Sequence, residues 1–150
     1  MELPLMSRHN ERDKMGEVNV RVRLTNAVDA EMAERGLLDP GQVRSREVDA
    51  IVDTGATRSV IPPEIAEEIG LRIRRETIAT LADGRRVSAG ISSPISFELE
   101  GRETQEDAYI MGDTVLIGQT VLESTDLLVD CNNRKVIPNP AHPDGPALRI

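Results

Sequence analysis

Residues 50–57, Ala-Ile-Val-Asp-Thr-Gly-Ala-Thr, constrain the fold of this chain more than any other stretch. Apolar residues run directly into Asp53, so the pattern predicts a short buried strand that delivers one carboxylate into a tight turn. Thr54 has a hydroxyl that can lock the turn, Gly55 lets the backbone approach reacting groups, and the small Ala56 leaves the floor of a site open. An ordinary turn would use the same residue types, because Asp and Gly are common in turns.

A second apolar pattern lies further along the chain. Val115-Leu116-Ile117 leads into Gly118, and the residues after this glycine begin a short helix. Between the two patterns, Pro62-Pro63-Glu64 opens a helix, with proline in the tolerated first turn and an acid at the positive end. Gly70 ends that helix.

In this order, the Asp-Thr-Gly-Ala turn and the Leu116-Ile117-Gly118 run resemble the two signatures of the retropepsin-like aspartic peptidases (clan AA), the single-domain retroviral type. The resemblance runs from about residue 17 to residue 140 and extends to small soluble bacterial peptidases of this kind. It implies an all-β fold: a closed acid-protease barrel with one or two short helices, assembled as a two-fold homodimer.

The resemblance also implies the site residues. The catalytic residues would be Asp53, Thr54 and Gly55. The substrate-binding residues would be Ala56, Thr57, Ala82, Asp83, Gly84 and Ile117. Residues 80–87 correspond by position to the flap that closes over a bound peptide, and their Asp-Gly pair is a hairpin signal. A surface hairpin with charged edges that discourages aggregation would have the same pattern.

The chemistry of such an enzyme requires two carboxylates about 3 Å apart that share one proton. Only one strand of this chain ends in Asp-Thr-Gly, so the second carboxylate would come from a second copy. A residue on a two-fold axis meets itself, and Asp53 would therefore face Asp53 of the partner. The function predicted is an aspartic endopeptidase that acts on protein or peptide substrates without a cofactor.

Two alternatives stay open beside the peptidase. The first is a retropepsin-like dimeric peptide-binding or assembly module with little or no proteolytic turnover. The second is a β domain whose Asp-Thr-Gly run is coincidental. The chain also departs from the retroviral pattern, in which an acid at position 57 pairs with an arginine at position 119. Here the residues are Thr57 and Gln119, so the support of the turn must be rebuilt by neutral hydrogen bonds or differ altogether.

The composition of the chain limits the classes of binding partner that are expected. A net charge of −8 and a pI near 4.8 argue against nucleic acid or an anionic membrane as partner. The chain has one cysteine, Cys131, which rules out an internal disulfide and is ordinary in a reducing compartment, so a cytoplasmic protein is expected. His9 and His142 lie far apart with no ligand spacing, and no metal site is predicted.

The expected organisation is a flexible tail over residues 1–16, the protease domain over 17–140 and an irregular tail over 141–150. Period-two alternation predicts a strand at 18–24, and Asp29 is expected to cap a short helix that ends at Gly36. Further strands are expected at 43–52, 76–81 and 86–89. Two more hairpins are expected, the first from 91–100 and 103–111 and the second from 127–130 and 135–137.

Overall fold

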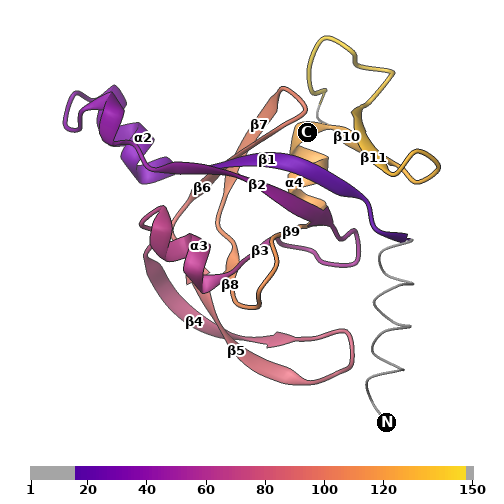
Figure 1. The fold of residues 1–150 in the computed structure, drawn as a ribbon, viewed down its shortest axis with the longest axis horizontal. Helices are drawn as coiled ribbons and strands as arrows, with labels where there is room; N and C mark the ends of the chain where they lie inside the picture. The colour runs from indigo at the N-terminus through magenta and orange to yellow at the C-terminus, as the bar shows by residue number, and fades with distance from the viewer. Residues whose placement is uncertain (1–15, 148–150) are drawn as a thin grey trace.

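The computed structural model describes residues 16–147, and this part of the chain is mostly β with a few short helices (Figure 1). Of the tail expected over residues 1–16, residues 1–15 lie outside the described residues. The strands are β1 (Asn19–Asn26), β2 (Ser45–Val52), β3 (Val60–Ile61), β4 (Ile73–Thr80), β5 (Arg86–Ser92), β6 (Ile95–Leu99), β7 (Arg102–Glu106), β8 (Tyr109–Ile110), β9 (Leu116–Ile117), β10 (Leu127–Asp130) and β11 (Lys135–Pro138). The α-helices are α2 (Ala27–Glu34), α3 (Pro63–Glu68) and α4 (Gln119–Thr125), and a 3-10 turn covers Pro40–Gln42.

Nine of the strands form one curved sheet in the order β4-β5-β8-β3-β9-β2-β1-β6-β7, and β10 pairs with β11 separately. The two outermost strands of the large sheet, β4 and β7, do not pair with each other within residues 16–147. The expected closed barrel is therefore not confirmed, because the sheet curls without closing. The described residues also contain three α-helices rather than one or two.

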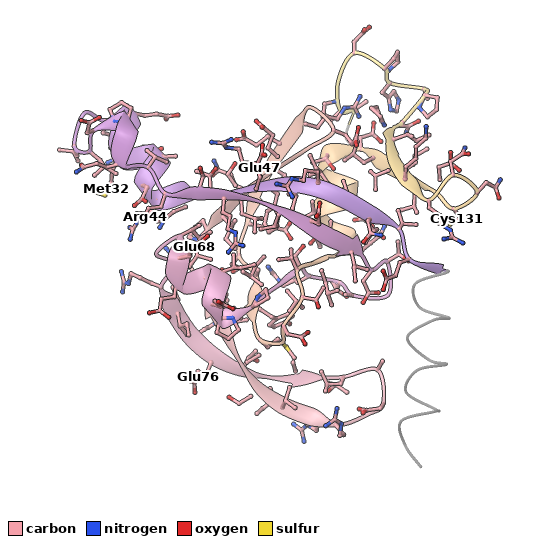
Figure 2. The ribbon with its side chains drawn as sticks, in the orientation of Figure 1. Met32, Arg44, Glu47, Glu68, Glu76 and Cys131 are labelled. Carbon is pink, nitrogen blue, oxygen red and sulfur yellow. The ribbon has the colours of Figure 1, made fainter. Side chains whose placement is uncertain are left out.

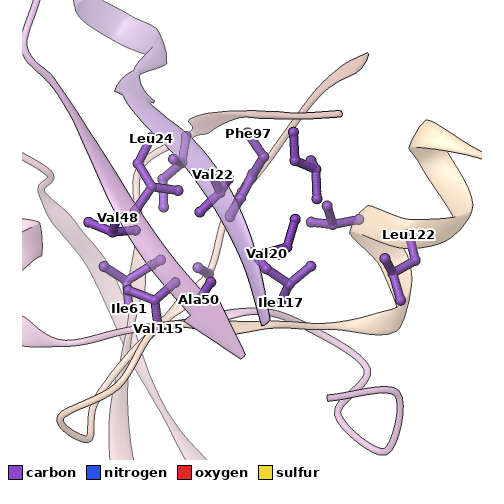
Figure 3. Packing of buried hydrophobic residues seen from close by; sticks show 14 of the residues in the cluster. Val20, Val22, Leu24, Val48, Ala50, Ile61, Phe97, Val115, Ile117 and Leu122 are labelled. Carbon is purple, nitrogen blue, oxygen red and sulfur yellow. The ribbon is translucent and has the colours of Figure 1, made fainter. Parts of the chain in front are cut away.

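The core forms where the β1–β2 hairpin packs on the rest of the sheet (Figure 3). Val20, Val22 and Leu24 point inward and are at most 5% exposed, as the alternation predicted. The arginines between them point outward, and Arg21 forms ion pairs with Asp49 and Glu47 across the hairpin. The other core side chains labelled in Figure 3 are Val48, Ala50, Ile61, Phe97, Val115, Ile117 and Leu122.

Helix α2 begins two residues earlier than expected, and its cap is Asn26 rather than Asp29. The Asn26 side chain accepts the Asp29 N–H at 3.0 Å and donates to the carbonyls of Ile69 and Gly70. The Asp29 carboxylate instead accepts three hydrogen bonds from Arg44, and this side-chain pairing lowers the pKa of Asp29. The difference arises because Asn26 occupies the cap position and Arg44, which is distant in the sequence, supplies the partner of Asp29.

The expected hairpin over residues 91–111 is split between two parts of the sheet. β5 ends at Ser92, where it lies against β4 and β8, and β6 starts at Ile95 beside β1 and β7. Pro94 lies at the break, and it has no N–H to continue a ladder. β8 leaves the hairpin in the same way and pairs in parallel with β3. No helix of the described residues is both long and apolar enough to cross a membrane.

The described end of the chain is held by polar contacts, although residues 141–147 contain no helix or strand. Arg102 is 7% exposed and donates to the carbonyls of Thr125, Asp126 and His142. The Asp126 carboxylate accepts hydrogen bonds from Asn139 and from the Ala147 N–H, and it lies 2.6 Å from the His142 ring. These contacts, with the Asn139 bond as the largest cause, lower the pKa of Asp126 to about 2.

Asp126→Asn tests this carboxylate through the pH dependence of stability. The pKa of about 2 in the folded protein lies below 3.8, the ordinary value for an aspartate, so the carboxylate stabilises the fold above about pH 4 and loses that effect as the pH falls through about 2. Asn tolerates the positive φ of 53° at this position, but it replaces one of the two accepting oxygens of Asp126 by an NH2 donor, so the charge is measured by how the stability gap changes with pH and not by its size at one pH. In urea unfolding, we expect the stability gap between native protein and variant to close between pH 4 and pH 2. A gap that stays constant would contradict this assignment.

Candidate active site

Asp53 lies at the point where strand β2 ends and the turn begins. The strand is held on both sides, because it pairs antiparallel with β1 and parallel with β9. The Asp53 N–H donates to the Ile117 carbonyl at 2.9 Å, and the Asp53 carbonyl accepts the Ala56 N–H at 3.1 Å. The backbone that carries this carboxylate is therefore fixed before and after the side chain.

The turn is locked by the Asp53 carboxylate itself. Its Oδ1 accepts the Gly55 N–H at 3.0 Å, and a Cβ on Gly55 would lie only 3.2 Å from the same oxygen. The sequence suggested the Thr54 hydroxyl as the lock, but within residues 16–147 that hydroxyl makes no hydrogen bond. Asp53 is half-buried, whereas Thr54 and Gly55 are exposed. The exposed side of the turn is thus free for contact with another molecule.

The beginning of α4 supports the turn from below with neutral hydrogen bonds. The Gln119 N–H donates to the Ala56 carbonyl at 2.8 Å, and the Thr120 N–H donates to the Thr57 carbonyl at 3.0 Å. These two bonds satisfy N–H groups at the start of the helix, which have no partner within the helix. They join the same two segments as the missing acid–arginine pair of the retroviral pattern, and they fit the expectation of neutral support.

Ser59 is a structural residue of the site that the sequence reasoning missed. It is fully buried, and its Oγ accepts the Gly118 N–H at 3.0 Å. Gly118 must be glycine here, because a Cβ would lie 2.5 Å from the Arg58 carbonyl carbon. Arg58 in turn forms a partly buried ion pair with Asp107, which ties the turn to the segment before β8. In the sequence, Ser59 is visible only as a serine beside a predicted strand. This pattern is too common to indicate a role in the site.

The turn opens into a cleft of about 640 Å³, a size typical of ligand sites. Its walls come from the turn, from the β4–β5 hairpin and from the segment between β8 and β9, which are far apart in the sequence. The lining residues are Asp53, Gly55, Ala56, Thr57, Arg58, Val60, Ile78, Ala79, Thr80, Leu81, Ala82, Tyr109, Met111, Gly112, Asp113, Thr114 and Leu116. Most of the wall is apolar, and Asp53 and Asp113 are its carboxylates.

Five of the nine predicted site residues line this cleft: Asp53, Gly55, Ala56, Thr57 and Ala82. Ile117 is fully buried in the core and does not line the cleft, whereas its neighbour Leu116 does. Successive side chains of a strand point to opposite faces, so the prediction chose the wrong face of β9. Thr54 lies beside the cleft on the exposed turn. Within residues 16–147 no group of three His, Cys, Asp or Glu side chains could hold a metal ion.

The tip of the β4–β5 hairpin lies over one side of the cleft. Leu81 and Ala82 line the cleft, while Asp83 and Gly84 form the turn beyond it. The Asp83 carboxylate accepts the Arg85 N–H at 2.9 Å and the Arg85 Nε at 2.7 Å, and the first of these bonds is the main cause of its lowered pKa. Gly84 has a φ of +86°, which favours glycine. The tip is therefore a tight turn closed by its own side chains.

These features define an aspartyl protease-like β protein, and the comparisons identify the family. A family model described as gag-polyprotein putative aspartyl protease matches residues 40–124, more than half of the chain, so the protein belongs to that family. A solved structure, the retroviral protease-like domain of Ddi1 from Leishmania major, is similar at 18% identity with a TM-score of 0.48. That match covers 87% of this chain and 94% of the other. The comparison with curated proteins finds no match.

Ser59→Ala tests the support beneath the turn. The substitution leaves the buried Gly118 N–H without its acceptor, so we expect a loss of about 1–3 kcal/mol in the free energy of unfolding. Ser96→Ala on β6 is the matched control, because this buried serine forms no side-chain hydrogen bond within the described part of the chain. Urea denaturation of both variants measures the difference. Equal losses would show that the Ser59 hydroxyl gives no specific support.

Proposed function

We propose that this protein is an aspartic endopeptidase whose two catalytic carboxylates are Asp53 and Asp53 of a second copy. The observation that carries the proposal is the position of Asp53: a half-buried carboxylate on a doubly held strand end, at the floor of a large apolar cleft. Membership of an aspartyl protease family supports the same chemistry.

The proposal of a dimer rests on the number of strands that end in an Asp-Thr-Gly turn. Within residues 16–147 the structure contains one strand that ends in Asp-Thr-Gly, and the other carboxylate in the cleft, Asp113, hydrogen-bonds the Thr114 hydroxyl on the segment before β9. A two-fold axis beside the exposed Thr54-Gly55 turn would bring the two Asp53 side chains together. The partner would also complete the open side of the cleft.

The proposed reaction is general acid–base catalysis by the shared-proton pair. Two carboxylates about 3 Å apart cannot both ionise readily, so one holds a proton. The ionised Asp53 takes a proton from a bound water, and that water attacks the scissile carbonyl. The protonated partner then donates its proton to the leaving amine. Gly55 and Ala56 leave room for the substrate backbone at the floor of the cleft.

The hairpin is the proposed flap. Ile78, Leu81 and Leu116 provide apolar walls, which favours substrates with aliphatic side chains next to the scissile bond. An extended peptide in the cleft would lie beneath the hairpin tip, where closure excludes water. Asp83 is paired with Arg85 and Arg58 with Asp107, so neither arginine is free to select an acidic residue.

Asp53→Asn tests the catalytic assignment. The amide keeps nearly the same shape but removes the shared proton, so we expect cleavage of an unbiased peptide library to fall by at least about a thousandfold. Asp113→Asn is the matched control, since it removes the other carboxylate of the cleft, and it is expected to retain turnover. Cleavage that survives in the Asp53 variant would overturn the proposal.

Mixing the two proteins tests the dimeric site and the alternative function, a dimeric peptide-binding module with little turnover. If each active site needs one Asp53 from each chain, random exchange in an equal mixture of native protein and Asp53→Asn leaves only native dimers active. We expect about a quarter of the activity of the same total amount of native protein. A value near one half would show that each chain works alone. Dimers in sedimentation without cleavage by the native protein would favour the binding module.

A further inference from the structure

The β4–β5 hairpin and its approach carry a charge opposite to that of the protein. The chain has 18 basic and 26 acidic residues, yet residues 72–86 contain five arginines and only two acids, Glu76 and Asp83. Figure 1 shows this hairpin as a long arm that curves away from the β1–β2 hairpin. The arm is thus a local basic surface on an acidic molecule, and such a surface attracts anionic partners.

Most of these arginines are not neutralised within the described chain. Elsewhere in residues 16–147, six of the eight arginines form ion pairs with carboxylates, whereas Arg102 binds carbonyls and Arg134 has no carboxylate partner there: the six are Arg21, Arg23, Arg35, Arg44, Arg46 and Arg58. On the arm only Arg85 does so, with Asp83. Arg72, Arg74, Arg75 and Arg86 are exposed and form no ion pair with any carboxylate of residues 16–147. Three of them gather at the base of the arm, at the start of β4.

β4 is also an open edge of the sheet. It is the outermost strand beside β5, and among residues 16–147 no other strand pairs with its outer side. Ile73 and Ile78 are each 55% exposed, which is unusual for isoleucine. Figure 2 places Glu76, the one acid of β4, on the outer side of the hairpin. After a bulge between Ile73 and Arg75, β4 pairs in regular register from Arg75 to Thr80, and the free backbone groups of its outer side can accept another strand.

We propose that the outer edge of β4 docks an extended acidic polypeptide segment by strand addition. The backbone of the segment would continue the sheet, its acidic side chains would pair with Arg74 and Arg75, and an aliphatic residue would cover Ile73, which does not line the cleft. A segment with alternating acidic and aliphatic residues fits this arrangement of charge and apolar surface. The docking edge is separate from Asp53 and does not depend on turnover. If the protein is a peptidase, the edge would add affinity for substrates that carry such a segment outside the cleft.

A polypeptide fits better than the other anionic partners. The net charge of −8 opposes every anionic partner of the arm, so charge alone does not choose among a polypeptide, a nucleic acid and an anionic vesicle. An extended peptide can form backbone hydrogen bonds in register along β4, and neither phosphates nor lipid headgroups can do so. The opposite edge, β7, carries Glu103 and Glu106 and has its one arginine, Arg102, turned inward to carbonyls. A second copy offering that edge is therefore a competing occupant for the test.

The experiment measures binding of a fluorescent peptide of alternating Glu and Val to the full-length Asp53→Asn protein by anisotropy. This variant removes turnover, so the result does not depend on the proposed peptidase activity. We expect the peptide to bind at least about tenfold more tightly than its Gln-for-Glu counterpart, and affinity to fall as salt rises from about 0.05 to about 0.3 M. N-methylation of alternate peptide N–H groups should abolish binding, because it blocks the ladder.

Variants locate the binding edge. Charge reversal by R74E/R75E should weaken binding at least about tenfold, and R74Q/R75Q should give a smaller loss. R134E/K135E is the matched control, with the same charge change on the turn of the β10–β11 hairpin, and should change affinity less than about twofold. Circular dichroism of each variant checks its fold.

Several outcomes would overturn the proposal. Binding that survives R74E/R75E, or that ignores N-methylation, would place the peptide elsewhere. Polyuridylate or phosphatidylserine vesicles that bind more tightly than the peptide and lose binding in R74E/R75E would make the arm a general anion surface. Concentration-dependent assembly beyond a dimer that R74E/R75E abolishes, without peptide binding, would identify a second copy as the occupant.

Discussion

The hydrogen bonds that join the end of β2 to β9 and to the start of α4 organise the rest of the site. Through them, Asp53 is attached to Ile117, Ala56 to Gln119 and Thr57 to Thr120, and each bond links residues that are far apart in the chain. Because the Gly118 backbone lies directly against Arg58, no side chain fits at position 118 and the two segments meet in one register only. These contacts place the Asp53 carboxylate at the floor of a cleft whose walls belong to other strands.

The same arrangement separates a supported face of the turn from a free one. Below the turn, the Ser59 hydroxyl accepts the Gly118 N–H, and the first two N–H groups of α4 donate to the carbonyls of Ala56 and Thr57. Above it, Thr54 and Gly55 remain exposed, and the Asp53 carboxylate has only the Gly55 N–H as a hydrogen-bond partner within the described chain. A strand end that is held by hydrogen bonds on one face and exposed on the other is consistent with a site completed by a second copy, as proposed. The basic arm formed by β4 and β5 adds a second exposed surface with a different charge.

The sequence predicted several elements well because they depend on local rules. The alternation at Val20, Val22 and Leu24 is visible in any strand with one wet face, and the Asp83-Gly84 turn follows from backbone preferences alone. The errors came where a residue had two possible partners. Asp29 could cap a helix or pair with an arginine, and the choice depended on Arg44, fifteen positions away. The face of Ile117 depended on the register of β9 beside β2, which is set by hydrogen bonds that no local pattern shows.

By itself, the sequence determined the strand that ends in Asp53, the need for glycine in the turn and the family of the protein, because these depend on short runs of residues whose chemistry is specific. Only the tertiary structure decided that the sheet curls without closing, that Leu116 rather than Ile117 faces the cleft and that Ser59 supports the turn. It also decided that Arg74 and Arg75 lie on an open edge and form no ion pair with any carboxylate of residues 16–147. The physical reason is that burial, pairing and exposure are properties of contacts between distant segments, and a linear pattern does not record which segments meet.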